Sequence, residues 1–546
     1  MAGEKKGKVV RQAAFLMAAQ MTSSVIGLLY RSPLHSIMGD VGDGYYQFAY
    51  EWYTIILLIA SYSIPSAVSK VMAERLAVKE YRNAFKVFKA ALIYVLIAGG
   101  IGASVAFFGA PYILADEPDA VLALRVLAPT IFLSGFLGVF RGFFQAHNTM
   151  KPTAVSQICE QLLNAAFSVF AAYMLAKPYL GDDNLSGKFG AAGGCIGTGA
   201  GVLTGFLVML LAYAMNYRFI HKRLKKDRTQ HTETYKEVFG VIFMMCTPII
   251  LATCVYNMTS VIDQVIFTRL MTARGMAADA IASLYGLFGY RVKPIINIPI
   301  ALASATSTAL IPAVATSMAE KSVKGAVSKI DECVKMTLFI SIPSAVGIGV
   351  LSYPVIRILY PSGNVQGASI LLSMGAVSVF FYSLSTVMNG VLQGLGHPSV
   401  PVRNAAIALA VNAAVTYLTV GFLNIDVYGI VIAAVVYSLT VMLLNSIAIH
   451  KYVRYRIKLR QLKAPLISSA VMGVGIGMIY WVPRLLLPGI FDRYLTSAVL
   501  CLIAVLLGIL IYMVVYNRAA GLTDDEVRSL PMGRKLLIVM KKLHIR

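Results

Sequence analysis

The stretch YEWYTIILLIASYSIPSAVSK (residues 50–70) is long and apolar enough to cross a bilayer, yet it carries Glu51 near its outer end. A membrane helix needs about 20 predominantly apolar residues, because the hydrocarbon core is about 30 Å thick and each helical residue rises about 1.5 Å. A charge at the centre of that core costs roughly 2.5–3.5 kcal/mol on insertion scales. The stretch therefore predicts a membrane helix whose carboxylate faces something other than lipid.

The whole chain has a similar composition. Of its 546 residues, 58% are hydrophobic and 13% are charged, and apolar runs recur from end to end. A soluble domain would interrupt such runs with polar helix or strand faces. We therefore expect an all-α integral membrane protein. The six cysteines form no CxxC pair, which indicates small buried hydrophobic residues rather than disulfides or metal ligands.

The net charge of +23 is unevenly distributed along the chain. Basic residues crowd into alternate segments between the apolar runs, and the other segments, such as 115–120 and 181–184, are short and acidic or neutral. This is the positive-inside pattern, which places the basic segments and both termini in the cytoplasm. The charge indicates a surface that faces anionic lipid, and nucleic-acid binding is not expected. The basic segments are 1–11, 70–89, 217–228, 450–463 and 533–546.

The apolar runs and the charge asymmetry together predict fourteen membrane helices. An even number agrees with two cytoplasmic termini, and the last segment, RKLLIVMKKLHIR, is typical of an amphipathic helix on the inner leaflet. The expected helices are 12–33, 44–69, 88–110, 121–145, 153–176, 189–215, 238–268, 280–317, 329–358, 366–393, 401–423, 427–449, 464–486 and 494–516.

The chain also repeats itself, with four matches in order along the sequence at offsets of 240, 246, 248 and 248 residues. The matches make the first six predicted helices equivalent to helices seven to twelve. Because six is even, equivalent helices cross in the same direction, and transporters built from such parallel repeats carry their substrate between the two halves. The matched pairs are YYQFAYE (45–51) with YGLFGYR (285–291), AVSKVMAER (67–75) with AVATSMAEK (313–321), RGFFQAHNTMKP (141–152) with NGVLQGLGHPSVP (389–401), and NAAF (164–167) with NAAV (412–415).

The repeat predicts two lobes and a C-terminal extension. The extension is a helix pair that lies outside the repeat. The expected parts are an N-terminal six-helix lobe (1–216), a basic cytoplasmic linker (217–237), a C-terminal six-helix lobe (238–449), the extra helices thirteen and fourteen (450–516) and a cytoplasmic amphipathic tail (517–546).

The repeat also suggests a role for the glutamate of the opening stretch. Glu51 in helix 2 is equivalent to Arg291 in helix 8. We expect both to face an aqueous cavity between the lobes, where water or a polar substrate relieves the desolvation that lipid would impose. Lys293 follows Arg291, and the prolines after it could bend helix 8 and bring both cations toward one space. Arg31 ends helix 1, where it either faces this cavity or extends to the outer interface.

Two further carboxylates lie in apolar helices without acidic equivalents in the other half, Glu160 in helix 5 and Asp263 in helix 7. Such residues are candidates for proton or monovalent-cation coupling, and the alternative is a hydrogen bond to a neighbouring helix. Arg141, Gln145 and Gln393 lie at the cytoplasmic ends of helices 4 and 10. They either anchor the loops there or form an inner gate.

The sequence contains no motif of an enzyme or an ATPase. GxxxxGK[ST], HExxH and GxSxG are absent, and no soluble domain is long enough to hold a nucleotide. We therefore expect a carrier without a cofactor, driven by an ion gradient, the membrane potential, substrate flux or a partner.

Three stretches resemble the polysaccharide-exporter branch of the multidrug/oligosaccharidyl-lipid/polysaccharide flippase superfamily. They are GVFRGFFQAHNTMKPTAVSQICEQ (138–161), MGDVGDGYYQFAYEWYT (38–54) and IPSAVSKVMAE (64–74). The resemblance covers essentially the whole chain, and it is closest to the fourteen-helix lipid II flippases and stage V sporulation proteins of Gram-positive bacteria. Ser24 and Tyr290 stand where such relatives often carry an arginine and an acidic residue.

The resemblance implies a monomeric V-shaped carrier of the bacterial cytoplasmic membrane that alternates between inward-open and outward-open forms. Its substrate would be an undecaprenyl-diphosphate-linked sugar or sugar-peptide, with the diphosphate at Arg31, Arg291 and Lys293. The two extra helices would supply a groove for the polyprenyl tail. The alternatives are a cation-coupled multidrug exporter of the same superfamily, a membrane-embedded glycosyltransferase and an envelope scaffold.

Overall fold

The computed structural model describes residues 19–62, 64–225, 227, 232–486, 489 and 493–520. Helices joined by turns and short irregular segments make up this described part, which contains no strand. The basic start of the chain and the predicted amphipathic segment of the tail lie outside the described residues. Contacts divide the chain into two compact units, residues 1–286 and residues 287–546.

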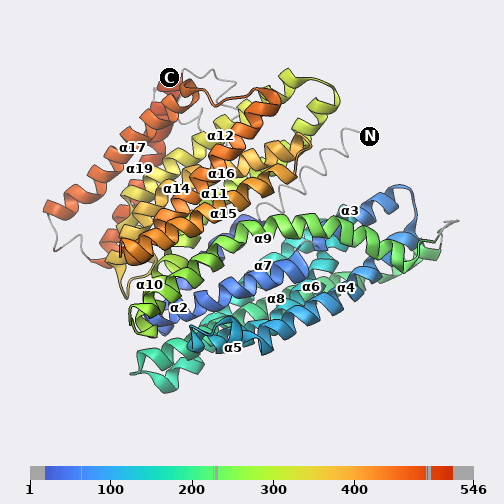
Figure 1. Cartoon of the computed structure of the whole chain (residues 1–546), viewed down its shortest axis with the longest axis horizontal. Coiled ribbons are helices and arrows are strands. Elements are labelled where there is room, and N and C mark those ends of the chain that lie inside the picture. Colours follow the sequence, from blue (N-terminus) through green and yellow to red (C-terminus); the bar gives the residue numbers. More distant parts are fainter. Residues whose placement is uncertain are drawn as a thin grey trace. The chain divides into compact units, whose positions relative to one another are not determined.

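The first unit is a bundle of long helices (Figure 1). Its long helices α4, α6, α7 and α8 lie side by side, and α2 packs against α8 and α10. A helix over Ala19–Leu29 precedes α2. The elements are α2 (Arg31–Leu57), η1 (Leu58–Tyr62), α3 (Ile64–Ala77), α4 (Tyr81–Phe108), α5 (Ala110–Ile113), η2 (Pro118–Ala120), α6 (Val121–Ala146), α7 (Lys151–Ala176), η3 (Lys177–Tyr179), α8 (Asp183–Lys225), α9 (Tyr235–Ala273) and α10 (Ala278–Gly286).

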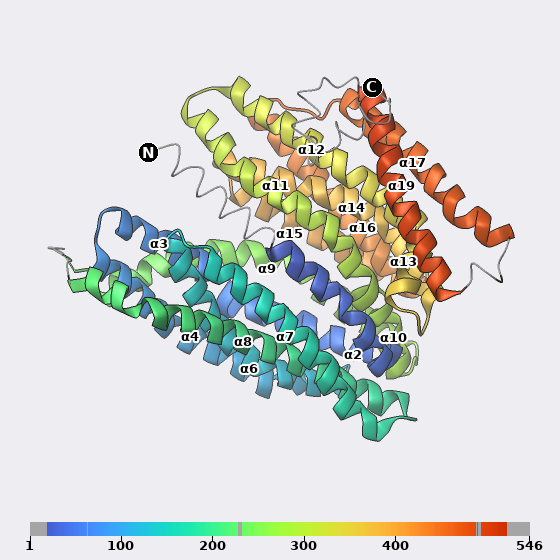
Figure 2. The ribbon, with the colours of Figure 1, turned by 180° about the vertical axis from the view of Figure 1, so that it is seen from behind.

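The second unit contains the extra helix pair. Here α14 packs against α11, α12 and α16, and α17 and α19 lie side by side against α12 (Figure 2). Tyr512 of α19 donates a hydrogen bond to the backbone oxygen of Phe339 of α12 at 2.9 Å. The elements are η4 (Leu287–Val292), α11 (Lys293–Ala319), α12 (Val323–Val350), α13 (Ser352–Leu359), α14 (Val365–Gly394), α15 (Ser399–Thr416), η5 (Tyr417–Phe422), α16 (Asp426–Val453), α17 (Leu459–Leu486) and α19 (Tyr494–Ala520).

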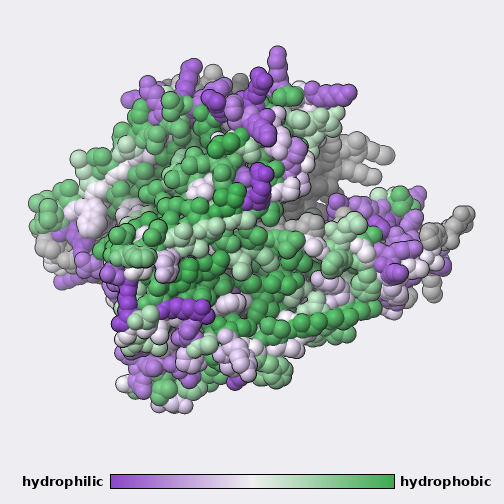
Figure 3. All heavy atoms as spheres, viewed as in Figure 1, coloured by the Kyte–Doolittle hydropathy of each residue, from purple (hydrophilic) through white to green (hydrophobic). Residues whose placement is uncertain are grey.

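Each unit has an apolar interior and an apolar flank. In the first unit, the ring of Phe88 of α4 packs against Phe140 and Phe143 of α6 and Tyr213 of α8, with ring centroids 4.9–5.7 Å apart. Hydrophobic side chains also cover most of the surface seen in Figure 3, and hydrophilic ones gather near helix ends. This is the surface of a membrane-spanning protein, because in water such exposed apolar area would drive aggregation.

Helices lie over all the predicted membrane segments, but some junctions differ from expectation. A loop was expected between residues 33 and 44, whereas α2 continues through this region and is broken only at Gly39, whose φ is 66°. Glycine adopts this left-handed conformation without a steric penalty, so one residue makes the bend. Helices 2 and 8 each contain a π-helical segment, η1 and η4.

Eleven helices of the described part are long and apolar enough to cross a membrane. The eleven leave out the predicted helices 1, 7 and 8, of which helix 1 appears only as the short apolar helix Ala19–Leu29. The number fourteen stays a prediction, and so do the lobe boundaries. Contacts group α9 and α10 with the first unit, whereas the repeat assigns residues 238–286 to the second lobe.

The internal repeat is visible in the turns. Helices α6 and α7 are joined at Asn148, which has a φ of 53°, and α14 and α15 are joined at Gly396, which has a φ of 85°. The two positions are 248 residues apart, the offset of the sequence repeat. A residue with a left-handed backbone conformation therefore follows the equivalent helix in both halves.

Candidate functional site

Two of the predicted site residues form an ion pair in the first unit. Arg141 of α6 donates from Nη2 to Oε2 of Glu160 of α7 at 2.6 Å, and from Nε to the hydroxyl of Ser156 at 3.1 Å. The side chains of Arg141 and Glu160 are 16% and 19% exposed. The coupling candidate and the gate candidate are thus one charge-neutral group, and a coupling cation at Glu160 would compete with Arg141 for the carboxylate.

Arg31 lies close to this group. It is the first residue of α2 and is partly buried. Its charge and that of Glu160 both act on the hydroxyl of Tyr50, and Arg31 also acts on Tyr46. The rings of Tyr46 and Tyr50 stack at 5.6 Å. Charged groups and tyrosine hydroxyls therefore gather among α2, α6 and α7.

Glu51 lies deeper in α2, where it is 7% exposed. Its Oε1 accepts a hydrogen bond from Nε2 of Gln47, one turn earlier, at 2.7 Å. A buried carboxylate is stabilised by such a donor, because an unsatisfied charge would bear the full desolvation penalty. Glu51 therefore does have a polar environment.

Three carboxylates of the first unit act on Tyr285 of α10. Glu51, Asp263 and Glu117 all act electrostatically on its hydroxyl, which donates to the backbone oxygen of Ser260 at 3.2 Å. Asp263 is 5% exposed. The structure thus places two of the predicted site residues, Glu51 and Asp263, near one phenol.

Arg291 lies in the second unit, in the π-helical segment η4, and is completely buried. Its guanidinium carbon lies 5.8 Å from the ring centroid of Tyr360, and this cation–π contact stabilises the buried cation. Lys293 begins α11 directly after this segment and is partly buried. The shared cavity of Glu51 and Arg291 stays a prediction, because the structure describes each in its own unit.

Gln145 and Gln393 are equivalent in the repeat and occupy equivalent places. Their backbone oxygens accept from the N–H of Asn148 at 2.9 Å and of Gly396 at 3.0 Å, at the ends of α6 and α14. The Gln393 side chain is exposed. The backbones of both residues thus close loops, and a role of their side chains in an inner gate stays a prediction.

Sequence reasoning missed Glu117. This residue lies in the short segment between α5 and η2, yet it is only 7% exposed. Its carboxylate accepts from Nε2 of Gln264 at 2.8 Å and from the hydroxyl of Thr268, both on α9. Burial raises the pKa of Glu117 from its ordinary value of 4.5 to about 7. Its place in an acidic loop resembles that of a solvated residue, so no signal in the sequence distinguishes it from Asp116 or Asp119.

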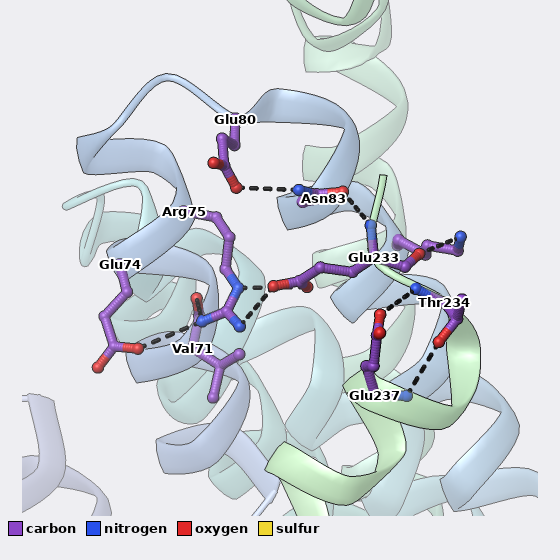
Figure 4. A network of polar contacts seen from close by, with 9 residues as sticks. Val71, Glu74, Arg75, Glu80, Asn83, Glu233, Thr234 and Glu237 are labelled. Atoms are coloured by element: carbon purple, nitrogen blue, oxygen red, sulfur yellow. Dashed lines mark hydrogen bonds and ion pairs between the residues drawn. The ribbon is translucent and has the colours of Figure 1, made fainter. Parts of the chain in front are cut away.

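A second missed network joins the segment before α9 to the α3–α4 turn (Figure 4). Arg75 donates from Nη2 to Glu233 at 2.8 Å, the N–H of Glu233 donates to Asn83 at 3.1 Å, and the amino group of Lys86 contacts the Glu233 backbone oxygen. Thr234 and Glu237 then form a capping box that starts α9. The start of α9 is therefore fixed to the first bundle at this end.

One cluster of side chains consists of possible metal ligands. In the described part of the chain, His35, Asp40 and Asp43 are the one His/Cys/Asp/Glu group with ligand atoms within 4.8 Å of each other. Nδ1 of His35 lies 2.9 Å from Oδ2 of Asp43, a hydrogen-bond distance across the bend at Gly39. This contact accounts for the buried pair as part of the bend.

An apolar groove of about 350 Å³ opens on the second unit between α12, α14 and the first extra helix, α17. Small residues such as Gly349 and Ala376 leave room between the helices. The lining is Ile342, Ala345, Val346, Gly349, Val350, Ser373, Ala376, Val377, Phe380 and Leu466.

Buried charges inside apolar helices, broken helices 2 and 8 and a repeated bundle are features of a membrane transporter, and comparison with known proteins places the chain in the multidrug/oligosaccharidyl-lipid/polysaccharide flippase superfamily. The chain belongs to the polysaccharide biosynthesis protein family, which matches residues 9–318. Residues 248–418 also match the MatE family.

Similarity to individual proteins supports this family assignment. The chain is 26% identical over 542 residues to the lipid II flippase MurJ of Bacillus subtilis (strain 168), covering 96% of this chain and 98% of that one. It is 21% identical to stage V sporulation protein B of the same organism, covering 84% and 86%. A solved structure of a lipid II flippase MurJ, in an inward closed conformation, has a TM-score of 0.63 at 16% identity and covers 92% of this chain and 98% of that one. The protein is therefore a multi-pass membrane transporter and not an enzyme.

Proposed function

We infer that this protein flips an undecaprenyl-diphosphate-linked cell-envelope precursor, lipid II or a related polysaccharide unit, from the inner to the outer leaflet by alternating access. The observation that carries this proposal is Arg291, a fully buried cation in a broken membrane helix. A charge at membrane depth is retained when it serves a function, and a guanidinium suits a diphosphate because its planar fork binds phosphate oxygens in pairs. Arg31 and Lys293 are the supporting cations and Glu51 the polar wall of the same cavity.

The apolar groove beside α17 supports a lipid-linked substrate. A polyprenyl tail has no polar group to satisfy, so a groove lined almost wholly by aliphatic and aromatic side chains suits it. The groove lies mainly between α12 and α14, and Leu466 of α17 borders it from the extra helix pair, which a carrier of water-soluble substrates would not need. Similarity to the lipid II flippase of Bacillus subtilis over 96% of the chain points to the same substrate class.

Coupling and location follow from the same proposal. Glu160 and Asp263 are the candidates for binding a proton or a monovalent cation, and no other cofactor is required. We place the carrier as a monomer in a bacterial cytoplasmic membrane. We place both termini in the cytoplasm, because the basic segments of the chain alternate with acidic or neutral ones.

One observation favours a second candidate, a cation-coupled multidrug exporter. Residues 248–418 match the MatE family, and Glu51, Asp263 and Glu117 make the interior of the first unit acidic. The buried Arg291 and the groove at α17 argue for the anionic lipid substrate instead.

Depletion of the protein followed by extraction of lipid carriers tests the proposal. We expect an intact lipid-linked sugar to accumulate on the cytoplasmic leaflet, where it stays inaccessible to an enzyme added outside. Arg291→Ala should abolish complementation while membrane insertion stays normal. The matched control is Arg460→Ala, which removes an exposed arginine of the same unit and should complement.

Three results would contradict the flippase. One is normal growth of the Arg291→Ala strain, and another is unchanged lipid carriers after depletion. Accumulation of a cationic drug without any change in lipid carriers would favour the multidrug exporter.

A further inference from the structure

The outer ends of α9 and α10 pack against the other helices of the first unit (α2 to α8, here called the first bundle), although the sequence repeat assigns α9 and α10 to the other lobe. Part of the contact of α10 with α2 is made by small residues: a Cβ on Gly44 would lie 2.0 Å from the Ala282 backbone oxygen, and one on Gly286 would lie 2.7 Å from the Gly44 nitrogen. At these positions the backbones meet directly. The buried rings of Phe48 of α2 and Tyr285 of α10 stack beside them with centroids 4.9 Å apart, so opening this seam would also separate that ring pair.

Polar contacts to a single short segment lock α9 beside this seam. Glu117 accepts from Gln264 and Thr268, and the adjacent Asp116 accepts from Nε of Arg269 at 3.2 Å. The segment 115–120 that carries these acids is one of the short acidic ones that the charge pattern places outside. The lock thus lies at the outer ends of the helices.

The charges around Glu117 favour a neutral carboxyl. No ion pair to Glu117 forms within the described residues, and Arg269, on the same helix as Gln264 and Thr268, is paired with Asp116. Gln264 and Thr268 donate to this carboxyl and so favour its ionised form, but burial is the larger effect, and because each also carries an acceptor both can hydrogen-bond the neutral carboxyl as well. Burial and the charge of Asp116 both penalise the ionised form. Other titratable or charged groups on the elements around this segment include Asp119, which pairs with Lys188 of α8, Tyr45 of α2, Arg125 of α6, Asp263 of α9, and Asp279 and Tyr285 of α10.

We propose that Glu117 is a proton-binding site of an outer gate: the neutral carboxyl holds α9 against the first bundle, and release of its proton to the outer solution frees α9 and α10. This inference rests on the proposed alternating-access function, and it names a coupling residue beyond Glu160 and Asp263. In the closed gate Glu117 is buried, and in the open gate it would meet water.

The sign of the pH effect follows from that difference. The pKa of Glu117 is about 7 in the closed gate and returns toward 4.5 in water, so the closed form binds more protons. Low external pH therefore favours the closed gate. As the pH rises through about 5 to 7, the equilibrium shifts toward the open form by up to about tenfold for each pH unit.

Distance measurements on the full chain test this. Spin labels at two exposed outer positions, Leu180 and Ala277, report the separation of α10 from the first bundle in nanodiscs between pH 5 and pH 8, in a background without the six native cysteines. We expect a growing long-distance population in the wild type as the pH rises. Glu117→Gln, which mimics the neutral carboxyl, should stay closed at every pH.

Two further variants separate the lock from folding. Asp116→Asn removes the neighbouring exposed acid and should keep a pH-dependent gate with a lower midpoint. Thr268→Val removes one hydrogen-bonding group and should populate the open form more at each pH. A graded increase of this kind would show that the measurement reports the lock and not global unfolding.

The gate proposal is overturned if wild-type distances do not change with pH, or if Glu117→Gln follows the wild-type pH curve. Flipping assayed separately keeps this outcome distinct from that of the proposed function. If the protein flips lipid carriers while the measured distances do not change with pH, the flippase proposal stands and the gate proposal is wrong. If the distances respond to pH as expected in a protein that flips no lipid carrier, the gate proposal is supported and the flippase proposal is wrong.

Discussion

The two halves of the repeat bridge the same helix junction with different chemistry. In the first half, Arg141 of α6 binds Ser156 and Glu160 of α7 through charge-assisted hydrogen bonds. In the second half, the positions equivalent to Arg141 and Ser156 are Asn389 and Asn404. Asn404 of α15 donates to Asn445 of α16 at 2.9 Å, and Asn445 donates to Asn389 of α14 at 2.6 Å.

The difference separates what the fold needs from what function adds. Both halves need a polar bridge at this depth, because helices in lipid gain little from hydrophobic contact and associate through packing and hydrogen bonds. The amide ladder supplies that bridge without charge, and Ala408 stands where the first half has Glu160. The ion pair is therefore more than the junction requires, and that excess makes it a candidate for coupling.

The largest effect is expected from Arg141→Ala. It leaves Glu160 mostly buried without its guanidinium, and removal of one partner of a buried pair is strongly destabilising. We expect a loss of about 2–3 kcal/mol, at the low end of the usual range because both side chains keep some exposure. Thermal unfolding of the detergent-solubilised protein measures it.

The control for this variant is Lys329→Ala, which breaks an exposed i,i+3 pair with Glu332 in the second unit. That change should cost less than about 0.5 kcal/mol. An Arg141→Ala protein as stable as the control would show that the ion pair contributes nothing to the junction.

Asn445→Ala should have the next largest effect. Asn445 is fully buried and bonds the amides of both Asn389 and Asn404, so its removal takes a hydrogen bond from each. The expected loss is about 1–2 kcal/mol in the same assay. Asn216→Ala, at an exposed amide that bonds only its own helix, should be close to neutral. Equal effects of the two would mean that the ladder is not a structural bridge.

A smaller effect is expected at the equivalent turns. Gly396→Ala forces a side chain into the left-handed region and should cost about 1 kcal/mol, since no neighbouring atom adds a clash. Asn148→Gly relieves the same strain in the first half and should change stability by a few tenths of a kcal/mol. Unfolding midpoints of both variants test whether the two turns are equivalent. A Gly396→Ala protein with an unchanged midpoint would contradict the strain.

Little effect on stability is expected when the first half is converted to the pattern of the second. Arg141→Asn with Glu160→Ala removes both charges together and leaves no unpaired ion, so stability should stay within about 1 kcal/mol of the wild type. Complementation should nevertheless be lost, because the coupling candidate is gone. Growth at the wild-type rate would limit the pair to a structural role.

Much of the fold could be predicted because its signals are local. Apolar runs and basic segments lie along the chain itself, and a helix of about 20 residues follows from them without any tertiary information. The bend at Gly39 and the π segments could not be predicted in this way. They depend on tertiary contacts within each unit, those of α2 and η1 in the first and those of η4 with α11 and α14 in the second.

Several residues of the candidate site could be predicted from the sequence, but the partners that they contact could not. Arg141 and Glu160 stand out as charges in apolar helices, yet nothing in their spacing of 19 residues shows that they pair. Glu117 was missed altogether, because an acid in a loop usually stays solvated, and here α9 covers it.

The sequence by itself determined that this protein is a helical membrane carrier with an internal repeat, since composition, charge asymmetry and repeated motifs are properties of the chain alone. Only the tertiary structure decided which charges meet and which carboxylate loses its water. The reason is that ion pairing and desolvation depend on how neighbouring helices are rotated and packed, and residues far apart in the chain set both.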